Sequence, residues 1–311
     1  MTIVPAVVAA QDATLQQGAK LFEQGRYAEA KQILIAAQRT APTADGAYYL
    51  GRIAFAENDA NAAVASLENA VKLEPKSSRA YGWLGRAYTL QLVSANKLRQ
   101  LSLAGRVRGA FETAVALDPD NSEARYDLVR FFLTAPGLAG GSMDRARQHA
   151  AELAKHSPMY GHFAAAMIAE KDRDAARATS EWEAAAAAAP DSGAAYFNLA
   201  SYYRRAKLWD EAWRTLDRYA ARRPDDPELA YHVGSTGAQS GRQVERAERA
   251  LRAYLARPWR PGTPTFSSAH LHLGELLERR GDRDGARREY QMALQLNPKN
   301  NQAKTALDHL G

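Results

Sequence analysis

The chain of 311 residues contains no cysteine. Disulfide bonds, thiolate metal ligands and cysteine nucleophiles are therefore excluded. No apolar run approaches the roughly 20 residues that a membrane-spanning helix needs, so the sequence predicts no transmembrane segment. The net charge of +6 is carried mostly by arginine, which favours an acidic partner over a basic one but does not by itself indicate nucleic acid.

The sequence also lacks a recognisable catalytic constellation. No acid–base pair and no nucleophile with a positioned base can be found. His149, His156 and His162 are seven and six residues apart, whereas two metal ligands on one helix are typically four apart. His270 and His272 are two residues apart and point to different faces of a helix. We therefore predict a protein that is not an enzyme, binds no metal and needs no cofactor.

The N-terminal residues, MTIVPAVVAAQD, contain a short apolar run that ends in small residues of the kind that signal peptidase cleaves. This run lacks the basic leader and the full length of a secretory signal. Two interpretations of residues 1–13 stay open: the tail of a signal peptide, or a disordered segment. The first predicts a periplasmic or cell-envelope location, and the second leaves a cytoplasmic location open.

A pattern of about 34 residues recurs along the rest of the chain. Leu-Gly pairs open helical stretches, and a proline closes each stretch after an amphipathic segment that is rich in alanine. The opening pairs are Leu50-Gly51, Leu84-Gly85 and Leu273-Gly274. The closing prolines are Pro75, Pro119 and Pro298. Short turn segments such as 57–59 and 280–282 separate the two helices, so each repeat is expected to be a helical hairpin.

This pattern resembles the tetratricopeptide repeat (TPR). The residues that match its first helix are Tyr81, Leu84, Gly85 and Tyr88, and those that match its second helix are Tyr27, Ala30, Leu34, Ala37 and Pro42. The resemblance implies an all-α fold, a right-handed α-solenoid of about eight TPR helix-turn-helix repeats. One solenoid domain would occupy residues 14–311 and would end in a capping helix over Asn300–Leu310.

Two repeats are longer than the pattern requires. About ten extra residues fall within 91–103 in the third repeat, and a Gly-rich segment at 134–142 separates the helices of the fourth. Ser142 is placed to cap the helix that follows. A phosphate-binding loop is the alternative, but the segment lacks the Gly-Lys-Ser/Thr ending and a preceding strand. The Gly-rich insertion resembles those of some bacterial envelope TPR proteins.

An arginine follows the Leu-Gly position in three successive repeats, at Arg52, Arg86 and Arg130. Residues three and four positions earlier share its helix face. These include Tyr48, Tyr49, Trp83, Tyr126 and Asp127. In TPR proteins this face lines the concave groove, so the resemblance implies an arginine ladder flanked by aromatic rings. Guanidinium groups bind carboxylates bidentately and stack on such rings, which suits an acidic peptide. The alternative is that each arginine pairs with an internal carboxylate, for example Arg130 with Asp127.

The equivalent face of the sixth repeat would carry Phe197, Asn198 and Arg204, which we also predict to bind peptide. An asparagine there resembles part of the carboxylate clamp of chaperone-binding TPR domains. The basic residues of that clamp are missing from the neighbouring repeats, where Phe163 and His232 stand instead. Binding of chaperone tails is therefore not expected.

Between Pro75 and Phe111 there is no acidic residue, whereas seven lysines and arginines occur. Our main hypothesis is a non-enzymatic scaffold that binds an extended, acidic protein segment in its groove. The alternative is a binder of a non-protein polyanion (nucleic acid, anionic glycan or lipid headgroup) through residues 75–111, with nucleic acid the least favoured of these. Self-association through the Ala-rich fifth repeat is a third hypothesis.

Overall fold

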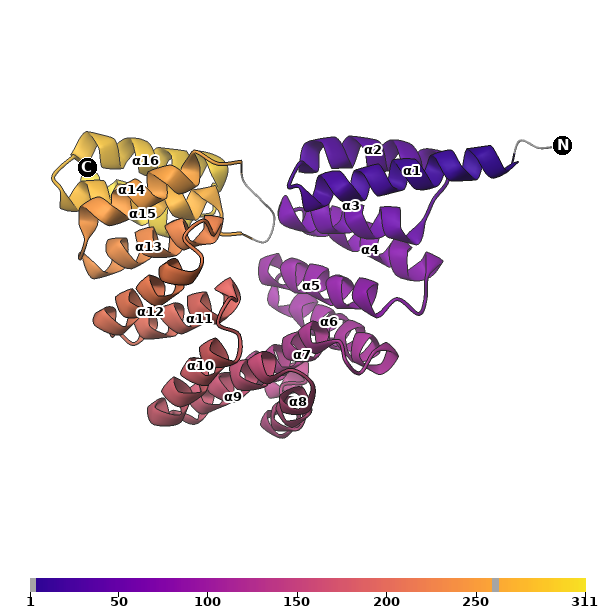
Figure 1. The fold of residues 1–311 in the computed structure, drawn as a ribbon, viewed down its shortest axis with the longest axis horizontal. Helices are drawn as coiled ribbons and strands as arrows, with labels where there is room; N and C mark the ends of the chain where they lie inside the picture. The colour runs from indigo at the N-terminus through magenta and orange to yellow at the C-terminus, as the bar shows by residue number, and fades with distance from the viewer. Residues whose placement is uncertain (1–3, 259–262) are drawn as a thin grey trace. The chain divides into compact units, whose positions relative to one another are not determined.

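The computed structural model describes the backbone of residues 4–258 and 263–311, and the side chains of residues 13–93, 95–258 and 263–311 (Figure 1). Within these ranges the chain is all-helical and contains no strand. The helices follow one another as hairpins, which confirms the predicted fold class. No helix in the described part of the chain is long and apolar enough to cross a membrane.

The helices form eight successive pairs and a closing helix, counted over the described residues. The first helices of the pairs are α1 (Val4–Glu23), α3 (Ala44–Ala56), α5 (Ser78–Ser94), α7 (Ser122–Thr134), α9 (Pro158–Asp172), α11 (Gly193–Arg205), α13 (Pro227–Ser240) and α15 (Phe266–Arg279). The second helices are α2 (Tyr27–Thr40), α4 (Ala60–Leu73), α6 (Lys97–Leu117), α8 (Met143–His156), α10 (Ala175–Ala188), α12 (Trp209–Arg222), α14 (Val244–Leu255) and α16 (Arg283–Leu296). The closing helix α17 (Asn301–Leu310) packs on α16 at the position predicted for the cap.

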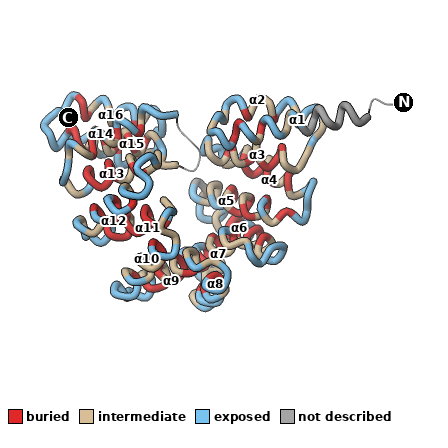
Figure 2. Tube along the Cα trace, in the orientation of Figure 1, coloured by how far each residue is buried: buried red, intermediate tan, exposed pale blue. Residues whose placement is uncertain are grey.

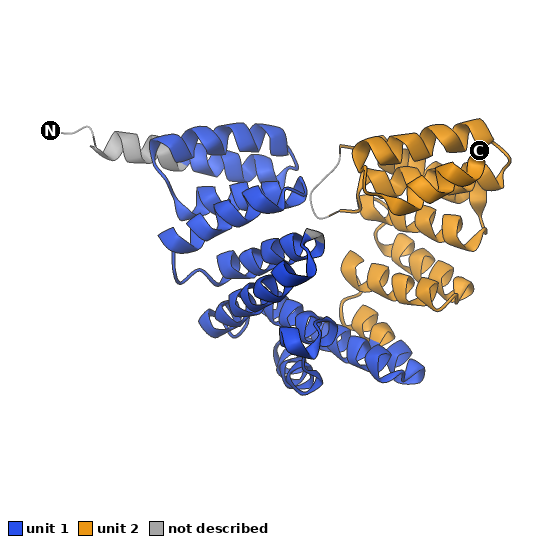
Figure 3. Cartoon of the chain, turned by 180° about the vertical axis from the view of Figure 1, so that it is seen from behind, with its two compact units in different colours: residues 1–181 blue, residues 182–311 orange. Residues whose placement is uncertain are grey.

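The chain divides into two compact units, residues 1–181 and 182–311 (Figure 3). The boundary falls within α10, in the repeat whose signature positions are mostly alanine. Figure 2 shows buried and exposed residues alternating along the described helices. Within each unit the buried hydrophobic residues form clusters that join neighbouring helices. Each unit is described separately below.

The Leu-Gly pairs have a packing reason. A methyl group built on Gly85 would lie 2.6 Å from the ring of Phe111, and one built on Gly274 would lie 2.4 Å from the ring of Tyr290. Only glycine allows the two helices to pack this closely, because a Cβ atom is essentially never found within 3.0 Å of another side chain. Phe111 and Tyr290 are both buried. The glycine of the first helix thus accommodates the aromatic side chain of the second.

The insertion predicted within 91–103 is built as helix and not as a loop. It lengthens both helices of the third hairpin, since α5 has 17 residues and α6 has 21. The turn between them is confined to Ala95 and Asn96, and the Asn96 side chain accepts the backbone N–H of Arg99 at 3.0 Å. The third hairpin therefore extends further than its neighbours in unit 1.

The Gly-rich insertion of the fourth hairpin contains a short 3₁₀ helix, η1 (Gly137–Ala139). A methyl group on Gly141 would lie 1.8 Å from the carbonyl oxygen of Ala135, so the loop closes too tightly for any larger residue. The Ser142 hydroxyl accepts the backbone N–H of Arg145 at 3.3 Å. This confirms the predicted role of Ser142 as the cap of α8.

At the N-terminus, α1 begins at Val4, ten residues before the predicted start of the repeats at Thr14. Residues 1–3, and the side chains up to residue 12, lie outside the described residues. The signal-peptide interpretation of residues 1–13 therefore stays a prediction.

Candidate peptide-binding site

A cleft of about 510 Å³ lies along the first helices of repeats two and three and the segment that leads into α7. It is lined by Tyr48, Arg52, Arg79, Gly82, Trp83, Arg86, Asp118, Asp120, Asn121, Ser122, Glu123 and Ala124. Four of these residues were predicted from the sequence to share a binding face: Tyr48, Arg52, Trp83 and Arg86. These four side chains, which share a helix face in the sequence pattern, therefore meet in one cleft of unit 1.

Arg52 lies among aromatic rings. Its guanidinium carbon is 4.4 Å from the ring centre of Phe22 and 4.7 Å from that of Trp83, distances at which a cation is attracted to the ring face. One amino group donates to the Tyr48 hydroxyl at 3.4 Å, while Nε is buried and has no hydrogen-bond partner among the described residues. Among the described residues no carboxylate forms an ion pair with Arg52. The group therefore keeps both its charge and an unused donor.

Arg86 is held differently. Its Nε donates to Asp127 at 2.6 Å, one amino group donates to Glu123 at 2.9 Å, and the guanidinium carbon lies 4.8 Å from the ring centre of Trp83. Burial lowers the pKa of Arg86, but the two carboxylates outweigh that effect and the net pKa is raised. Arg86 is therefore a compensated cation that stacks on the same indole as Arg52.

Arg130 shares the carboxylate of Arg86. It donates to Asp127 at 3.3 Å, and its side chain is 57% exposed whereas that of Asp127 is 10% exposed. This is the internal pairing that the sequence left open as the alternative. Arg130 is not among the residues that line the cleft. The three arginines therefore differ in how far their charge is compensated by the described residues. Arg52 has no carboxylate partner, Arg86 has two, and Arg130 has one that it shares with Arg86.

The two other predicted aromatic residues of unit 1 serve the packing between repeats. Tyr49 lies 5.3 Å from the ring centres of both Phe22 and Tyr48. Tyr126 packs against Tyr160 and Phe163 and donates to the sulfur of Met167 at 3.4 Å. Neither residue lines the cleft, so as ligand contacts they stay predictions.

Part of the cleft was not predicted from the sequence. Arg79 lies over Tyr48 at 4.7 Å and pairs with Asp45. Phe22, from the first repeat, lies beside Arg52 without lining the cleft itself. Asp118 and Asp120 come from the turn that closes the third repeat. Arg79 and Asp45 are 34 residues apart, which is one repeat length. Residues at this spacing occupy equivalent positions in neighbouring repeats, so the ion pair could have been predicted from the sequence.

The acid-free segment 75–111 is not a bare cationic surface. Four of its seven basic side chains pair with carboxylates from outside the segment. The pairs are Arg79 with Asp45, Arg86 with Asp127 and Glu123, Arg106 with Glu68, and Arg108 with Glu112. Lys76, Lys97 and Arg99 form no ion pair with any described residue. The repeat stacking supplies the acids that the segment itself lacks.

The three predicted residues of the sixth repeat lie in unit 2. Phe197 is 7% exposed and stacks on His232, with ring centres 4.1 Å apart. Asn198 is exposed, and its amide donates to the carbonyl of Ala194 at 2.9 Å. Arg204 donates to the Ser235 and Thr236 hydroxyls at 3.1 and 3.3 Å and has no carboxylate partner among the described residues. Burial lowers the pKa of Arg204, because no opposite charge offsets the loss of water.

Comparison with known proteins agrees with this architecture. A family model described as tetratricopeptide repeat matches residues 51–91, 163–227 and 236–301, together more than half of the chain. The chain belongs to the TPR family. No curated protein sequence matches it significantly. Proteins of this family generally mediate protein–protein interaction and are typically non-enzymatic repeat scaffolds.

Solved TPR structures share the fold at low sequence identity. A thermophilic TPR protein of Thermus thermophilus has 18% identity and a TM-score of 0.52, over 61% of this chain and 97% of its own. A monomeric mutant of IFIT1, solved with Gppp-AAAA, has 15% identity and a TM-score of 0.57, over 94% of this chain and 70% of its own. A TPR protein of Parabacteroides merdae has 13% identity and a TM-score of 0.49, over 97% and 99%. At these identities the first two similarities show the fold alone.

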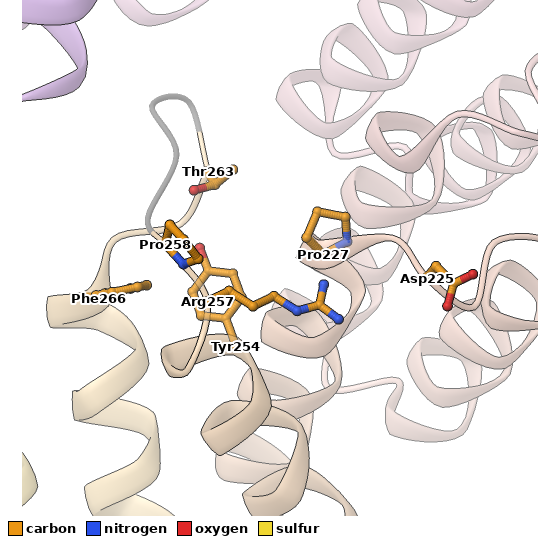
Figure 4. A pocket seen from close by; sticks show the side chains of 7 residues that line it. All are labelled: Asp225, Pro227, Tyr254, Arg257, Pro258, Thr263 and Phe266. Atoms are coloured by element: carbon orange, nitrogen blue, oxygen red, sulfur yellow. The ribbon is translucent and has the colours of Figure 1, made fainter. Parts of the chain in front are cut away.

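Unit 2 has a pocket of about 390 Å³, smaller than the cleft of unit 1 (Figure 4). It is lined by Asp225, Pro227, Tyr254, Arg257, Pro258, Thr263 and Phe266. In Figure 4 the Arg257 side chain extends toward Pro227, at the start of α13. The Tyr254 hydroxyl donates to the carbonyl of Pro264 at 2.5 Å, which fixes one wall. No group of three or more metal-binding side chains is present in the described part of either unit.

Glu228 lies next to that pocket, in the first turn of α13. We expect this residue to make the free energy of unfolding of unit 2 depend on pH. Burial, and then the Asp226 carboxylate, raises the pKa of Glu228 from 4.5 to about 7. The folded state therefore binds more protons than the unfolded state between these values, so stability falls as the pH rises through this range. Glu228→Gln should stabilise unit 2 by about 1–2 kcal/mol at about pH 8, after allowance for solvent screening, and by close to nothing near pH 4.5. Urea unfolding of both proteins at the two pH values measures this, and an equal gain at both would contradict the assignment.

Proposed function

We propose that this TPR protein is a scaffold that binds an extended protein segment through the cleft of unit 1, and that Arg52 receives an acidic side chain of that segment. One observation carries the proposal: Arg52 lines the cleft without a carboxylate partner, whereas Arg86 beside it has two. The chain thus supplies acids to Arg86 and Arg130 and leaves Arg52 for a ligand.

The surroundings of Arg52 suit a carboxylate. Arg52 is half-buried and pairs with no carboxylate of the described chain, so its amino groups can donate to a ligand carboxylate. Hydrogen bonds to charged groups contribute about 1.5–3 kcal/mol. The rings of Phe22 and Trp83 hold the guanidinium in place, so little side-chain freedom is lost on binding. A well-placed cation without a partner therefore favours binding of an anionic group.

The other charges of the cleft limit how acidic the ligand can be. Asp118, Asp120 and Glu123 lie in the same lining as Arg52, Arg79 and Arg86. A run of acidic residues would be repelled by these carboxylates, whereas a single acid between apolar or aromatic neighbours would meet Arg52 and the exposed part of Trp83. We therefore infer a segment with one acidic residue at the Arg52 position rather than a polyacidic one.

The alternative, a non-protein polyanion at residues 75–111, has less support. Nucleic acids and anionic glycans need many uncompensated cations along a path. Four of the seven cations in this segment are paired within the fold. The Gppp-AAAA in the IFIT1 structure does not argue for it, because the similarity to that protein is one of fold only. An envelope location stays a prediction, which sequencing the N-terminus of the protein made in its natural host would test.

Selection of a random-peptide display library on the purified protein tests the proposal. Wild type should enrich peptides with a single Asp or Glu, and Arg52→Glu should lose these peptides by at least about tenfold, the effect of removing a charged hydrogen bond. Arg39→Glu, at an exposed position of α2 and with the same change in charge, serves as the matched control and should select like wild type. Enrichment without acidic residues, or the same peptides on Arg52→Glu, would refute the proposed role of Arg52.

A further inference from the structure

The extended end of the third hairpin exposes an unusual set of apolar side chains. Val93 is 75% exposed near the end of α5, and on α6 Leu98 is 84% exposed and Leu101 is 52% exposed. We call the segment 93–101 the hairpin tip. Single exposed leucines are ordinary on protein surfaces, but these three lie within nine residues, on the part of the hairpin that the insertion adds.

No part of the described chain covers this end of α6. Leu98, Leu101 and Gly105 are spaced by three and four residues and share one helix face, while Leu103 and Val107 face the core on the other side. A methyl group built on Gly105 would meet no atom within 4 Å. The face that continues from the hairpin tip is therefore open to whatever lies outside the unit.

Two cations accompany the exposed leucines. Lys97 and Arg99 are exposed at the start of α6 and form no ion pair with any described residue. No acidic residue occurs between Pro75 and Phe111. The hairpin tip therefore combines uncovered apolar side chains with uncompensated positive charge. In this it differs from the rest of the segment, where the arginines are paired.

We propose that the hairpin tip binds the surface of an anionic lipid bilayer. Apolar side chains flanked by Lys and Arg are typical of segments that lie in the membrane interface, where the apolar groups enter the acyl boundary and the cations meet anionic headgroups. A protein partner fits less well, because the centres of protein interfaces are depleted of lysine and enriched in aromatic residues and methionine, and the hairpin tip contains a lysine but no aromatic residue or methionine. The surface is separate from the Arg52 cleft and does not depend on the proposed peptide binding.

The size of the hairpin tip sets the kind of binding to expect. Three aliphatic side chains are too few to anchor a protein of this size permanently, so attachment should be reversible. Because two exposed cations contribute, attachment should also weaken as salt screens them. The structure therefore predicts weak, charge-selective membrane association.

Co-sedimentation with lipid vesicles tests the proposal. Wild type should sediment with phosphatidylcholine vesicles that contain phosphatidylglycerol at roughly one part in three, and should stay in solution with pure phosphatidylcholine. Leu98→Asp/Leu101→Asp and Lys97→Glu/Arg99→Glu should each lower the bound fraction about tenfold or more. Two matched double variants lie in unit 2 and make the same changes in charge, so both should bind like wild type. They are Leu208→Asp/Leu296→Asp, at leucines that are 42% and 52% exposed, and Lys299→Glu/Lys304→Glu, at exposed lysines.

The variants change exposed side chains, so circular dichroism should show unchanged helix content. Binding of both hairpin-tip variants at the wild-type level would overturn the proposal, and so would equal binding of wild type to neutral vesicles. Sedimentation equilibrium without lipid tests the alternative that a second copy of the chain binds the hairpin tip. A dimer that Leu98→Asp/Leu101→Asp abolishes, together with no binding to vesicles, would assign the hairpin tip to a second copy of the chain.

Discussion

Gly274→Leu is expected to destabilise unit 2 by about 3 kcal/mol or more. The new side chain would start 2.4 Å from the ring of Tyr290. That ring is fully buried and its hydroxyl donates to Glu278 at 2.8 Å, so it cannot swing away without losing a hydrogen bond. Overpacking of a filled core costs typically 1–3 kcal/mol and more where the neighbours cannot move. Guanidinium unfolding followed by circular dichroism measures the loss.

Gly105→Leu is the matched control for this substitution. Gly105 also lies within a helix, but the space around it is open. Because leucine has the higher helix propensity by roughly 0.8 kcal/mol, this variant should be as stable as wild type or slightly more stable. If Gly274→Leu were equally well tolerated, the close contact between the glycine and the aromatic ring would not be what holds the hairpin together.

Asp127→Ala should be nearly as damaging to unit 1, by about 2–3 kcal/mol. Asp127 is largely buried and neutralises both Arg86 and Arg130. Breaking a buried ion pair typically costs 3–5 kcal/mol, and the lower figure allows for the 24% exposure of Arg86 and for its second partner, Glu123. The midpoint of urea unfolding should fall accordingly. Binding of acidic peptides should strengthen in the same variant, because Arg86, which lines the cleft, loses one of its two carboxylate partners.

Asp284→Ala provides the comparison for Asp127→Ala. Asp284 pairs with Arg287 at 3.6 Å on the surface, where it is 84% exposed. Such pairs contribute at most about 1 kcal/mol, and often nothing measurable. Equal losses of stability in the two variants would mean that the buried position of Asp127 does not matter. Weaker peptide binding by Asp127→Ala would mean that Asp127 does not compete with a ligand for Arg86.

The fold could be predicted from the sequence almost completely, and the reason is periodicity. A repeat places the same residue types at the same structural positions, so a few matched motifs locate every hairpin. The form of the third-repeat insertion was not predicted. It is helical because the segment from Lys97 to Phe111 contains no proline and keeps buried residues at Leu103, Val107 and Phe111, spaced by four. Their burial outweighs the low helix propensity of the two glycines in the segment.

The site was predicted in part. Tyr48, Arg52, Trp83 and Arg86 could be predicted to share one surface, because residues three and four positions apart lie on the same face of a helix. Helix geometry alone says nothing of contacts between repeats. It could not assign the ion pairs. Arg86 meets Asp127, 41 residues later, and that contact depends on how one repeat stacks on the next. The difference between Arg52 and Arg86 therefore becomes visible only in three dimensions.

A double-mutant cycle tests the role of Arg52 most directly. One acidic peptide from the library selection and its carboxamide analogue, with Gln or Asn in place of the acid, are titrated against wild type and Arg52→Gln by fluorescence anisotropy. The account predicts that the acid and Arg52 are coupled by about 1.5 kcal/mol or more, so that wild type prefers the acidic peptide at least about tenfold and Arg52→Gln does not. A coupling of zero, with both proteins discriminating the two peptides equally, would contradict it.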